Sequence, residues 1–373
     1  MLQDTAGHPL VIGHRGASGY RPEHTRSAYD LAFVLGADAV EPDIVATRDG
    51  VLVLRHENEI SGTTDVATRP EFAGLRTTRE VDGRSLTGWF TEDFTWAELA
   101  TLRATERLGA LRQESASFDR RYPLLRLRDL FELIDAAADE HRRMLRMVAE
   151  FKHATHFAEL GLPLDELFVA ELEAAGWGRG DERLIIESFE LDLLDRLRAR
   201  GIRAPRVFLI EATGAPYDLL RAHGRGAARY DDFATEAGLL GLAGRVDGVS
   251  VGKGRLIGEL RSTSAEDAAR ENMERRASGL LVGGGLVDAA HSAGLRVYTW
   301  TLRPENRFLA RGFRRGSARA AFGDWLGEFT LLIDTGVDGI FVDHPDLGVE
   351  ARTVAAAADV ASARSRRPDV RRS

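Results

Sequence analysis

The chain has 373 residues, of which 44% are hydrophobic and 29% charged, enough for one large folded core. Its net charge of −8 argues against a general nucleic-acid binder, because such proteins usually carry a basic face. The sequence contains no cysteine, which excludes disulfides and thiolate metal sites. Any metal ligand must therefore come from carboxylates, histidines or other oxygen atoms.

The N-terminal stretch MLQDTAGHPL has no basic region followed by an apolar run, so it predicts no signal peptide. No run of about 18 apolar residues predicts a membrane span. We therefore expect a protein without a transmembrane segment, located in the cytoplasm, or in the periplasm or outside the cell if the chain is a mature form. The sequence gives no oligomeric state.

Short apolar runs alternate with helical patterns along the chain. Apolar strands that alternate with helices indicate a parallel sheet covered on both faces, and about eight of them favour a closed (β/α)8 barrel, or TIM barrel. No GxGxxG motif follows the first strand, which weakens a dinucleotide-binding interpretation. Strands are predicted over 9–14, 38–45, 50–56, 143–152, 182–189, 205–210, 246–252, 295–302 and 337–343, and helices over 25–36, 127–143, 164–175, 190–201, 284–293 and 326–335.

Three stretches break this alternation. Residues 57–125 have few strand signals and are interpreted as an inserted subdomain or lid, and residues 303–325 as a long basic loop. The chain from about 353 begins with an Ala-rich helical pattern and ends in a basic tail predicted to be disordered. We therefore expect one barrel domain over 1–352, an insertion over about 57–125, and a tail over 353–373.

Polar side chains stand where several predicted strands end. The first strand ends at His14 and Arg15, and the strand over 50–56 ends at His56. The C-terminal ends of the strands form the active-site face of a (β/α)8 barrel. Imidazole titrates near neutral pH, so His14 and His56 are candidates for a general acid and base pair. Hydrogen-bonded structural histidines are the alternative interpretation.

Two spacings predict a metal site. Side chains alternate along a strand, so Glu41 and Asp43 share one side of theirs, as Glu150 and Lys152 do of theirs. If those sides face the barrel interior, three carboxylates converge, repel one another and have raised pKa values. A divalent cation resolves this conflict, and oxygen ligands suit Mg²⁺ or Ca²⁺. Ion pairing to nearby arginines explains the same acids without a metal, and the spacing favours neither interpretation.

Lysine is rare in this chain. Of the 50 basic residues, only Lys152 and Lys253 are lysines, and the others are arginines. A retained lysine suggests a site that needs a compact ammonium rather than a wide guanidinium group, although two residues are also compatible with chance. Lys152 and Arg15 beside a metal would make a cradle for a phosphate.

Five separated motifs, in order, resemble the glycerophosphodiester phosphodiesterase family, and the first resembles its bacterial periplasmic type. The resemblance implies a (β/α)8 barrel with an insertion after the second strand, and hydrolysis of glycerophosphodiesters to glycerol 3-phosphate and an alcohol with a divalent cation. The motifs are HRGASGYRPEHT (14–25), EPDIVATRDGVLVLRHE (41–57), EFK (150–152), YTWTLRPEN (298–306) and GVDGIFVDHPD (336–346).

The resemblance also implies roles for individual residues. It makes His14 and His56 the acid–base pair, and it places the aromatic Trp300 near the glycerol and Lys253 at the end of a glycine-rich strand, both as substrate-binding residues. The remaining roles are phosphate binding by Arg15 and Lys152, and binding of Ca²⁺ or Mg²⁺ by Glu41, Asp43 and Glu150.

Three positions depart from the family pattern. Glu57 stands where an aspartate is usual after the histidine, Glu187 where a glutamine is common, and His153 where a proline is frequent. These departures leave the choice of substrate open. The alternatives are a phosphodiesterase or phospholipase D-like enzyme acting on lysophospholipid, sphingolipid or a glycerophosphate polymer, and a barrel that binds a phosphodiester without cleaving it.

Overall fold

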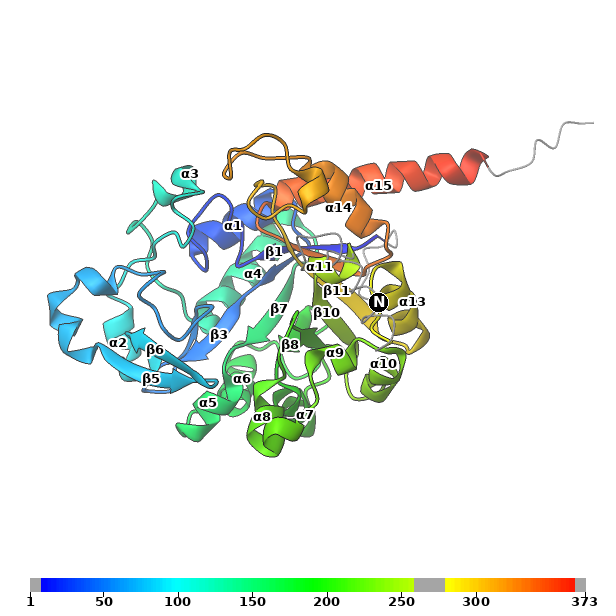
Figure 1. The fold of residues 1–373 in the computed structure, drawn as a ribbon. Helices are drawn as coiled ribbons and strands as arrows, with labels where there is room; N and C mark the ends of the chain where they lie inside the picture. The colour runs from blue at the N-terminus through cyan, green and yellow to red at the C-terminus, as the bar shows by residue number, and fades with distance from the viewer. Residues whose placement is uncertain (1–7, 258–278, 366–373) are drawn as a thin grey trace, which may run out of the picture.

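The computed structural model describes residues 8–257 and 279–365. Its central feature is a closed barrel of eight parallel strand positions surrounded by helices, which confirms the predicted fold (Figure 1). The second position is divided into two short strands. In chain order the barrel strands are β1 (Leu10–His14), β2 (Ala39–Glu41) with β3 (Asp43–Ala46), β7 (Arg146–Phe151), β8 (Leu184–Ser188), β9 (Arg206–Ile210), β10 (Gly248–Gly252), β11 (Arg296–Leu302) and β12 (Gly339–Val342).

The first and last strands close the barrel. β1 pairs in parallel with β12 on one side and with β2 on the other, and β7 pairs with both β2 and β3. The strands are apolar on both faces, as expected of a parallel sheet covered by helices. One group of buried side chains comes from seven of the eight strand positions and packs together separately from the larger core, which places it inside the barrel: Leu10, Ile12, Ala39, Val148, Ile185, Val207, Tyr298 and Phe341.

Helices cover the outside of the barrel. The first of them, α1 (Arg26–Val34), begins where the Thr25 side chain accepts a hydrogen bond from the Ala28 backbone N–H, and it buries Tyr29 and Phe33. The others that follow barrel strands are α4 (Leu127–His141), α5 (Ala154–Glu159), α6 (Leu164–Ala174), α7 (Leu191–Ala199), α8 (Tyr217–His223), α9 (Tyr230–Phe233), α10 (Glu236–Leu242), α11 (Lys253–Leu256), α13 (Gly284–Ser292), α14 (Trp325–Ile333) and α15 (Pro345–Ser365).

The predicted strand over 38–45 is interrupted at Pro42. Proline has no backbone N–H to donate, and the ladder stops at Glu41 and resumes at Asp43. The Pro42 carbonyl still accepts a hydrogen bond of 2.9 Å from the Glu150 backbone N–H. Glu41 and Asp43 therefore flank a break in the strand that lies directly beside Glu150.

The strand predicted over 50–56 is not part of the parallel barrel. It is shortened to β4 (Leu52–Leu54), which pairs antiparallel with β3 through residues such as Ile44 and Leu54. Five residues separate the two strands, and a connection this short permits a hairpin but not the crossover that parallel pairing requires. The expectation of a parallel strand was wrong here, but the hairpin still carries His56 back toward the barrel.

The insertion after β4 contains a hairpin that the sequence interpretation missed. The strands β5 (Thr77–Val81) and β6 (Arg84–Gly88) are joined by Asp82 and Gly83, whose φ angles are 48° and 74°. Two successive positive φ angles define a type I′ turn, for which Asp-Gly is a favoured pair. The insertion also holds η1 (Val66–Thr68), η2 (Pro70–Leu75), η3 (Thr91–Asp93), α2 (Trp96–Leu99) and α3 (Gln113–Ala116).

The C-terminal helix α15 continues through the expected boundary at 352. Ala351 and Ala355 on this helix are both buried in the main core, so the barrel's packing extends beyond that boundary. The loop over 303–325 contains only one short element, η5 (Arg311–Phe313), and η4 (Gly224–Gly226) follows α8. Within the described ranges, no helix is both long and apolar enough to cross a bilayer.

Candidate active site

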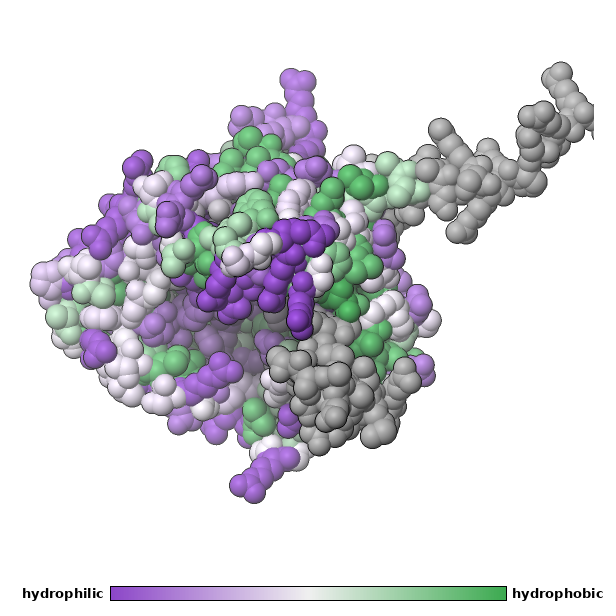
Figure 2. Space-filling view, turned by 45° about the horizontal axis from the view of Figure 1, so that its top comes forward, coloured by the Kyte–Doolittle hydropathy of each residue, from purple (hydrophilic) through white to green (hydrophobic). Residues whose placement is uncertain are grey.

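A cavity of about 900 Å³ opens at the C-terminal ends of the strands. Figure 2 shows this face hollowed, with mostly hydrophilic residues inside the hollow. Glu41 and Asp43 lie beside Glu150, one of the lining residues. The structure thus brings the candidate residues to one site, and seven of them line the cavity wall: His14, Arg15, His56, Glu150, Lys152, Lys253 and Trp300.

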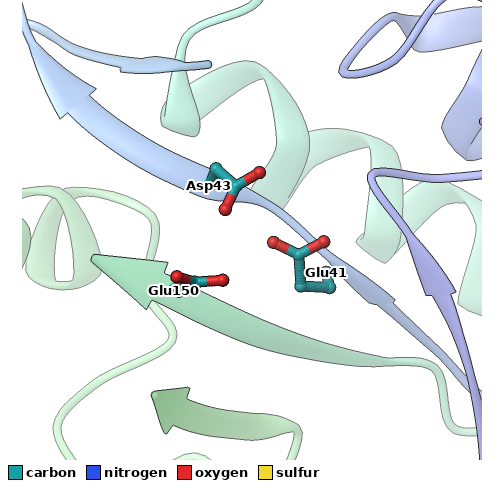
Figure 3. Close-up of side chains that lie close together, drawn as sticks. All are labelled: Glu41, Asp43 and Glu150. Atoms are coloured by element: carbon teal, nitrogen blue, oxygen red, sulfur yellow. The ribbon is translucent and has the colours of Figure 1, made fainter. Parts of the chain in front are cut away.

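Three carboxylates converge at the base of the site. Each of Glu41, Asp43 and Glu150 offers an oxygen within 4.8 Å of the others, and Figure 3 shows the three carboxylates facing one another from neighbouring strands. Glu41 and Asp43 are fully buried and Glu150 nearly so. Glu41 Oε2 accepts a hydrogen bond of 2.9 Å from the Arg15 backbone N–H, and Glu41 Oε1 is buried with no partner among the described residues.

Two cationic side chains, Lys152 and Arg15, adjoin this cluster, and they lower the pKa of Asp43 but do not keep those of Glu41 and Glu150 at their usual values. Lys152 Nζ lies 2.9 Å from Asp43 Oδ1 and also pairs with Glu150, and Arg15 Nε lies 3.1 Å from Asp43 Oδ2. Burial alone would raise the pKa of Asp43, but Lys152, His56 and Arg15 hold it well below its usual value. Burial, with Asp43 and Glu150 close by, raises the pKa of Glu41 well above its usual value, and burial raises that of Glu150 to about 7 despite Lys152.

The residues present fit a hard divalent cation. Three carboxylates supply only oxygen ligands, as Mg²⁺ and Ca²⁺ prefer, and the unpartnered Glu41 Oε1 is a buried acceptor available to a cation. A cation bound among them would also offset the burial and the repulsion from Asp43 and Glu150 that together raise the pKa of Glu41.

The His14 side chain is held by the carboxylate of Asp343, which directly follows β12. Its Nδ1 lies 2.7 Å from Asp343 Oδ1, and Asp343 is almost fully buried. Burial would raise the pKa of Asp343, but Arg303, Arg112 and His14 hold it well below its usual value, so the carboxylate accepts and the imidazole Nδ1–H donates. Burial and Arg15 lower the pKa of His14 to about 4, so the ring is neutral near pH 7 with its proton on Nδ1.

His56 has a matching arrangement. Its Nδ1 lies 2.5 Å from Glu57 Oε1, and Glu57 also binds Arg107 through both carboxylate oxygens. Burial, Arg15 and Lys152 lower the pKa of His56 to about 3, so this imidazole is also neutral near pH 7. The extra methylene of Glu57, compared with the aspartate common in the family, does not prevent its carboxylate from reaching the histidine.

The turn after β1 holds Arg15 in place. Arg15 has a φ of 61°, and its Nη1 donates a hydrogen bond of 3.0 Å to Glu23. His24, within the same loop, contacts Asp43 Oδ2 through Nε2 at 2.9 Å and Tyr29 through Nδ1. Glu23 therefore holds the Arg15 side chain, and His24 holds the Asp43 carboxylate of the acidic cluster.

The other substrate-binding candidates lie in the cavity wall. Trp300 is partly exposed there, and its ring packs edge-on against Phe189 with centroids 5.9 Å apart. Lys253, at the start of α11, pairs with the buried carboxylate of Glu328. Of the departures from the family pattern, Glu187 is buried with a pKa raised by burial and Glu150, and His153 Nδ1 lies 2.6 Å from Asp82 of the hairpin turn.

Sequence reasoning singled out Glu57 beside His56 but missed three other residues that support the two histidines: Asp343, Arg107 and Arg112. Asp343 falls in the quoted motif GVDGIFVDHPD and at the end of the last strand, a position that could have identified it. Arg107 and Arg112 lie in the insertion, at no strand end, and the chain's many other arginines give them no distinguishing local signal.

Two carboxylate-bound histidines and three clustered carboxylates thus meet at one cavity of a (β/α)8 barrel, and the comparisons with known proteins assign the chain to a class of phosphodiester hydrolases. The sequence matches the glycerophosphoryl diester phosphodiesterase family over residues 14–347, and the chain belongs to that family. It is 30% identical over 349 residues to glycerophosphodiester phosphodiesterase GDPD6 of Arabidopsis thaliana, covering 90% of this chain and 83% of that protein.

Solved structures show the same fold. A phosphodiesterase from Oleispira antarctica in complex with the product sn-glycerol-3-phosphate is 18% identical, with a TM-score of 0.55 and coverage of 93% of this chain and 97% of that one. A glycerophosphodiester phosphodiesterase from Agrobacterium tumefaciens is 17% identical, with a TM-score of 0.52 and coverage of 92% and 99%.

Proposed function

We propose that the protein hydrolyses glycerophosphodiesters to glycerol 3-phosphate and an alcohol. The observation that carries this proposal is the pair His14 and His56, each with a carboxylate on Nδ1 and each lining the cavity beside the acidic cluster. Family membership supports the substrate class. The experiment that tests it is an assay on glycerophosphocholine and glycerophosphoethanolamine in which the phosphate-containing product is identified.

Glu41, Asp43 and Glu150 would hold Mg²⁺ or Ca²⁺, and the bound ion would supply positive charge to the phosphate oxygens. Arg15 and Lys152 line the cavity beside this cluster and bind the non-bridging phosphate oxygens. In a site with little water, these charges stabilise the negative charge that develops on the phosphate in the transition state.

The two histidines move the protons. One accepts a proton at Nε2 from the nucleophile, which is water or the 2-hydroxyl of the glycerol. The other must first take up a proton at its own Nε2, because both rings are neutral near pH 7, and then donates that proton to the leaving alkoxide. Attack by the 2-hydroxyl would give a cyclic phosphate that water then opens. Asp343 and Glu57 keep Nδ1–H as the donor on each ring, so Nε2 remains the reacting atom.

Replacement of either histidine tests this assignment. His14→Ala and His56→Ala should each lower kcat by about 10²–10⁴-fold, because each removes one proton-transfer step. The measurement is glycerol 3-phosphate release at saturating substrate, with circular dichroism to establish folding. His141→Ala, on the outer helix α4, is the control and should retain activity. A folded double variant of His14 and His56 with full activity would refute the mechanism.

Removal of divalent cations tests the acidic cluster. Exhaustive chelation should abolish turnover, and Mg²⁺ or Ca²⁺ should restore it, because the ion would supply positive charge to the phosphate oxygens that the acidic cluster alone lacks. Glu41→Gln should raise the metal concentration needed for half-maximal activity without unfolding the protein. Turnover unaffected by chelation would rule out the metal.

A larger, polyanionic substrate is a second candidate. The loop over 303–325 contributes Arg303 and Phe308 to the cavity wall. A glycerophosphate polymer would place further phosphates near this loop, which also carries five exposed arginines: Arg307, Arg311, Arg314, Arg315 and Arg319. Comparison of kcat/KM for the polymer and for glycerophosphocholine distinguishes these two substrates. Tight binding of both compounds without turnover, whichever divalent metal is added, would favour a barrel that binds a phosphodiester without cleaving it.

A further inference from the structure

We propose that the insertion supplies two positioning arginines, Arg107 and Arg112, each of which fixes the carboxylate that orients one of the two histidines. The inference rests on the proposed function, in which His14 and His56 transfer protons. It assigns the insertion a part in the acid–base machinery in addition to forming part of the cavity wall.

Arg112 fixes the carboxylate that holds His14. Its Nη2 donates a hydrogen bond of 2.7 Å to Asp343 Oδ2, and its Nε donates one of 2.6 Å to Glu305. Asp343 Oδ1 receives His14, so the two oxygens of one carboxylate are divided between the histidine and the arginine. The Arg112 side chain is only 5% exposed, and Arg303 Nε also donates to Asp343 Oδ2 at 2.6 Å. The plane of this carboxylate is thus fixed from two directions.

Arg107 performs the same task for His56. Its Nη1 and Nη2 donate to the two Glu57 oxygens at 2.8 and 2.6 Å, in the paired geometry for which a guanidinium is suited. The same side chain donates to both oxygens of Glu23 at 2.7 and 2.8 Å, and Glu23 in turn accepts from Arg15. One guanidinium therefore links the support of His56 to the support of the phosphate-binding Arg15.

The segment that carries both arginines is itself held in place. The Glu106 backbone N–H donates a hydrogen bond of 2.7 Å to Asp119, and the Glu106 side chain accepts from the Leu108 backbone and from Ser115 at 2.8 and 2.5 Å. Arg107 and Arg112 therefore project from a braced turn rather than from a free loop. Glu57, which is 34% exposed, has a long side chain that could otherwise turn toward water, and Arg107 removes that freedom.

A purely structural role, in which the arginines only attach the insertion to the barrel, predicts a loss of stability without an effect specific to proton transfer. Positioning predicts a fall in kcat with KM nearly unchanged, because the ground-state contacts to substrate persist while the reacting groups are misaligned. Arg112→Gln should lower kcat by about 10–100-fold and change KM by less than about threefold. Arg107→Gln should lower kcat by a similar factor and also raise KM, because Arg107 holds Glu23, which supports the phosphate-binding Arg15.

Arg69→Gln is the matched control. Arg69 lies in the same insertion, is 30% exposed compared with 27% for Arg107, and binds the carboxylate of Asp65 at 3.0 Å, away from both histidines. It should retain the wild-type kcat even if the free energy of unfolding falls. An equal loss of kcat in Arg69→Gln and in the two test variants would overturn the proposal.

A double-variant comparison shows whether each arginine acts through its carboxylate. Arg112→Gln added to Asp343→Asn should lower kcat by less than about twofold beyond the single carboxylate variant. Arg107→Gln added to Glu57→Gln should lower kcat by a smaller factor than Arg107→Gln does in the wild type, and the remaining loss comes from its second partner, Glu23. If the kcat loss in each double variant equals the product of the losses in its two single variants, the proposal is overturned. If a glutamine variant does not fold, Arg107→Lys or Arg112→Lys takes its place under the same criteria, because one ammonium cannot bridge two carboxylates as a guanidinium does.

A readout without turnover separates this proposal from the proposed function. In protein with ¹⁵N-labelled histidine, the His14 and His56 ring signals, assigned by their alanine variants, should move in Arg112→Gln and Arg107→Gln respectively and remain in place in Arg69→Gln. If the wild type hydrolyses no glycerophosphodiester but the signals respond in this way, the proposed function fails and the positioning stands. Unmoved signals in both test variants would overturn the positioning.

Discussion

At the scale of single residues, the pKa values of two buried acids near the cavity shift in opposite directions because their neighbours differ. Asp343 and Glu190 are both almost fully buried. Burial would raise the pKa of Asp343, but the adjacent Arg303 and Arg112 hold it well below its usual value. Burial raises the pKa of Glu190 to about 7, because hydrogen bonds from Thr155 do not offset it and Asp82 adds repulsion. Of these two acids, Asp343 has arginines beside it and keeps its charge near pH 7, whereas Glu190 is partly protonated there.

Glu190 therefore gives a stability that depends on pH. Its pKa is about 7 in the folded protein and about 4.5 in the unfolded chain, so the folded state binds the proton more tightly. This contribution is complete below pH 4.5 and is lost as the pH rises to about 7, by up to about 3 kcal/mol. Urea unfolding at pH 5 and pH 8 should show a smaller decline for Glu190→Gln than for the wild type. Identical declines in the two proteins would contradict the assignment.

At the scale of elements, short connections determine which side chains reach the cavity. The break at Pro42 allows Glu41 and Asp43 to flank Glu150, and the β3–β4 hairpin carries His56 back to the strand ends. The turn after β1 is equally restrictive. Gly16 has a φ of 84°, and a Cβ added to it would lie 2.6 Å from the Ala28 backbone carbon.

Gly16→Ala tests this turn. The variant should lose about 2–5 kcal/mol of unfolding free energy, because it combines backbone strain with a clash against the backbone of α1. Gly161→Ala is the control, since its φ is 74° but nothing lies within 4 Å of an added Cβ, so only the strain applies. Urea titration measures both, and equal losses would show that the contact with α1 is unimportant.

At the scale of the whole molecule, α15 fastens the end of the chain to its beginning. Arg352 Nη1 donates to the Pro9 carbonyl at 3.1 Å and pairs with Asp38 at 2.5 Å, and Asp38 also accepts from the Val11 backbone N–H. Figure 1 shows α15 running along the outside of the barrel beside α14 and extending beyond it. The helix therefore acts as part of the barrel closure over its first turns.

Truncation locates where this contribution ends. A chain cut after residue 352 loses the buried Ala355 and should be about 1 kcal/mol less stable than a chain cut after 358, which retains it. Both should keep the activity of the full chain, because no residue beyond 347 belongs to the matched family region. Equal urea midpoints for the two truncated chains would show that Ala355 does not stabilise the barrel.

The sequence predicted the barrel and the candidate site because both depend on local patterns. Apolar runs mark the strands, and His14, Glu41 and Glu150 stand at or near their ends. It did not predict the antiparallel pairing of β4, because a strand pattern does not specify the direction of its partner. Nor did it predict Arg107 or Arg112, whose partners are distant in the chain and are chosen only when the insertion folds onto the barrel.

The contact between His14 and Asp343 has a consequence for the protein during its synthesis. The two residues are 329 positions apart, and the second directly follows β12, which comes after the other barrel strands in the described part of the chain. The sheet cannot close before that strand emerges, and pairing over such a separation is slow. A chain that has been synthesised only as far as residue 342 therefore has a His14 ring without its carboxylate partner, and this contact can form only after Asp343 has been added.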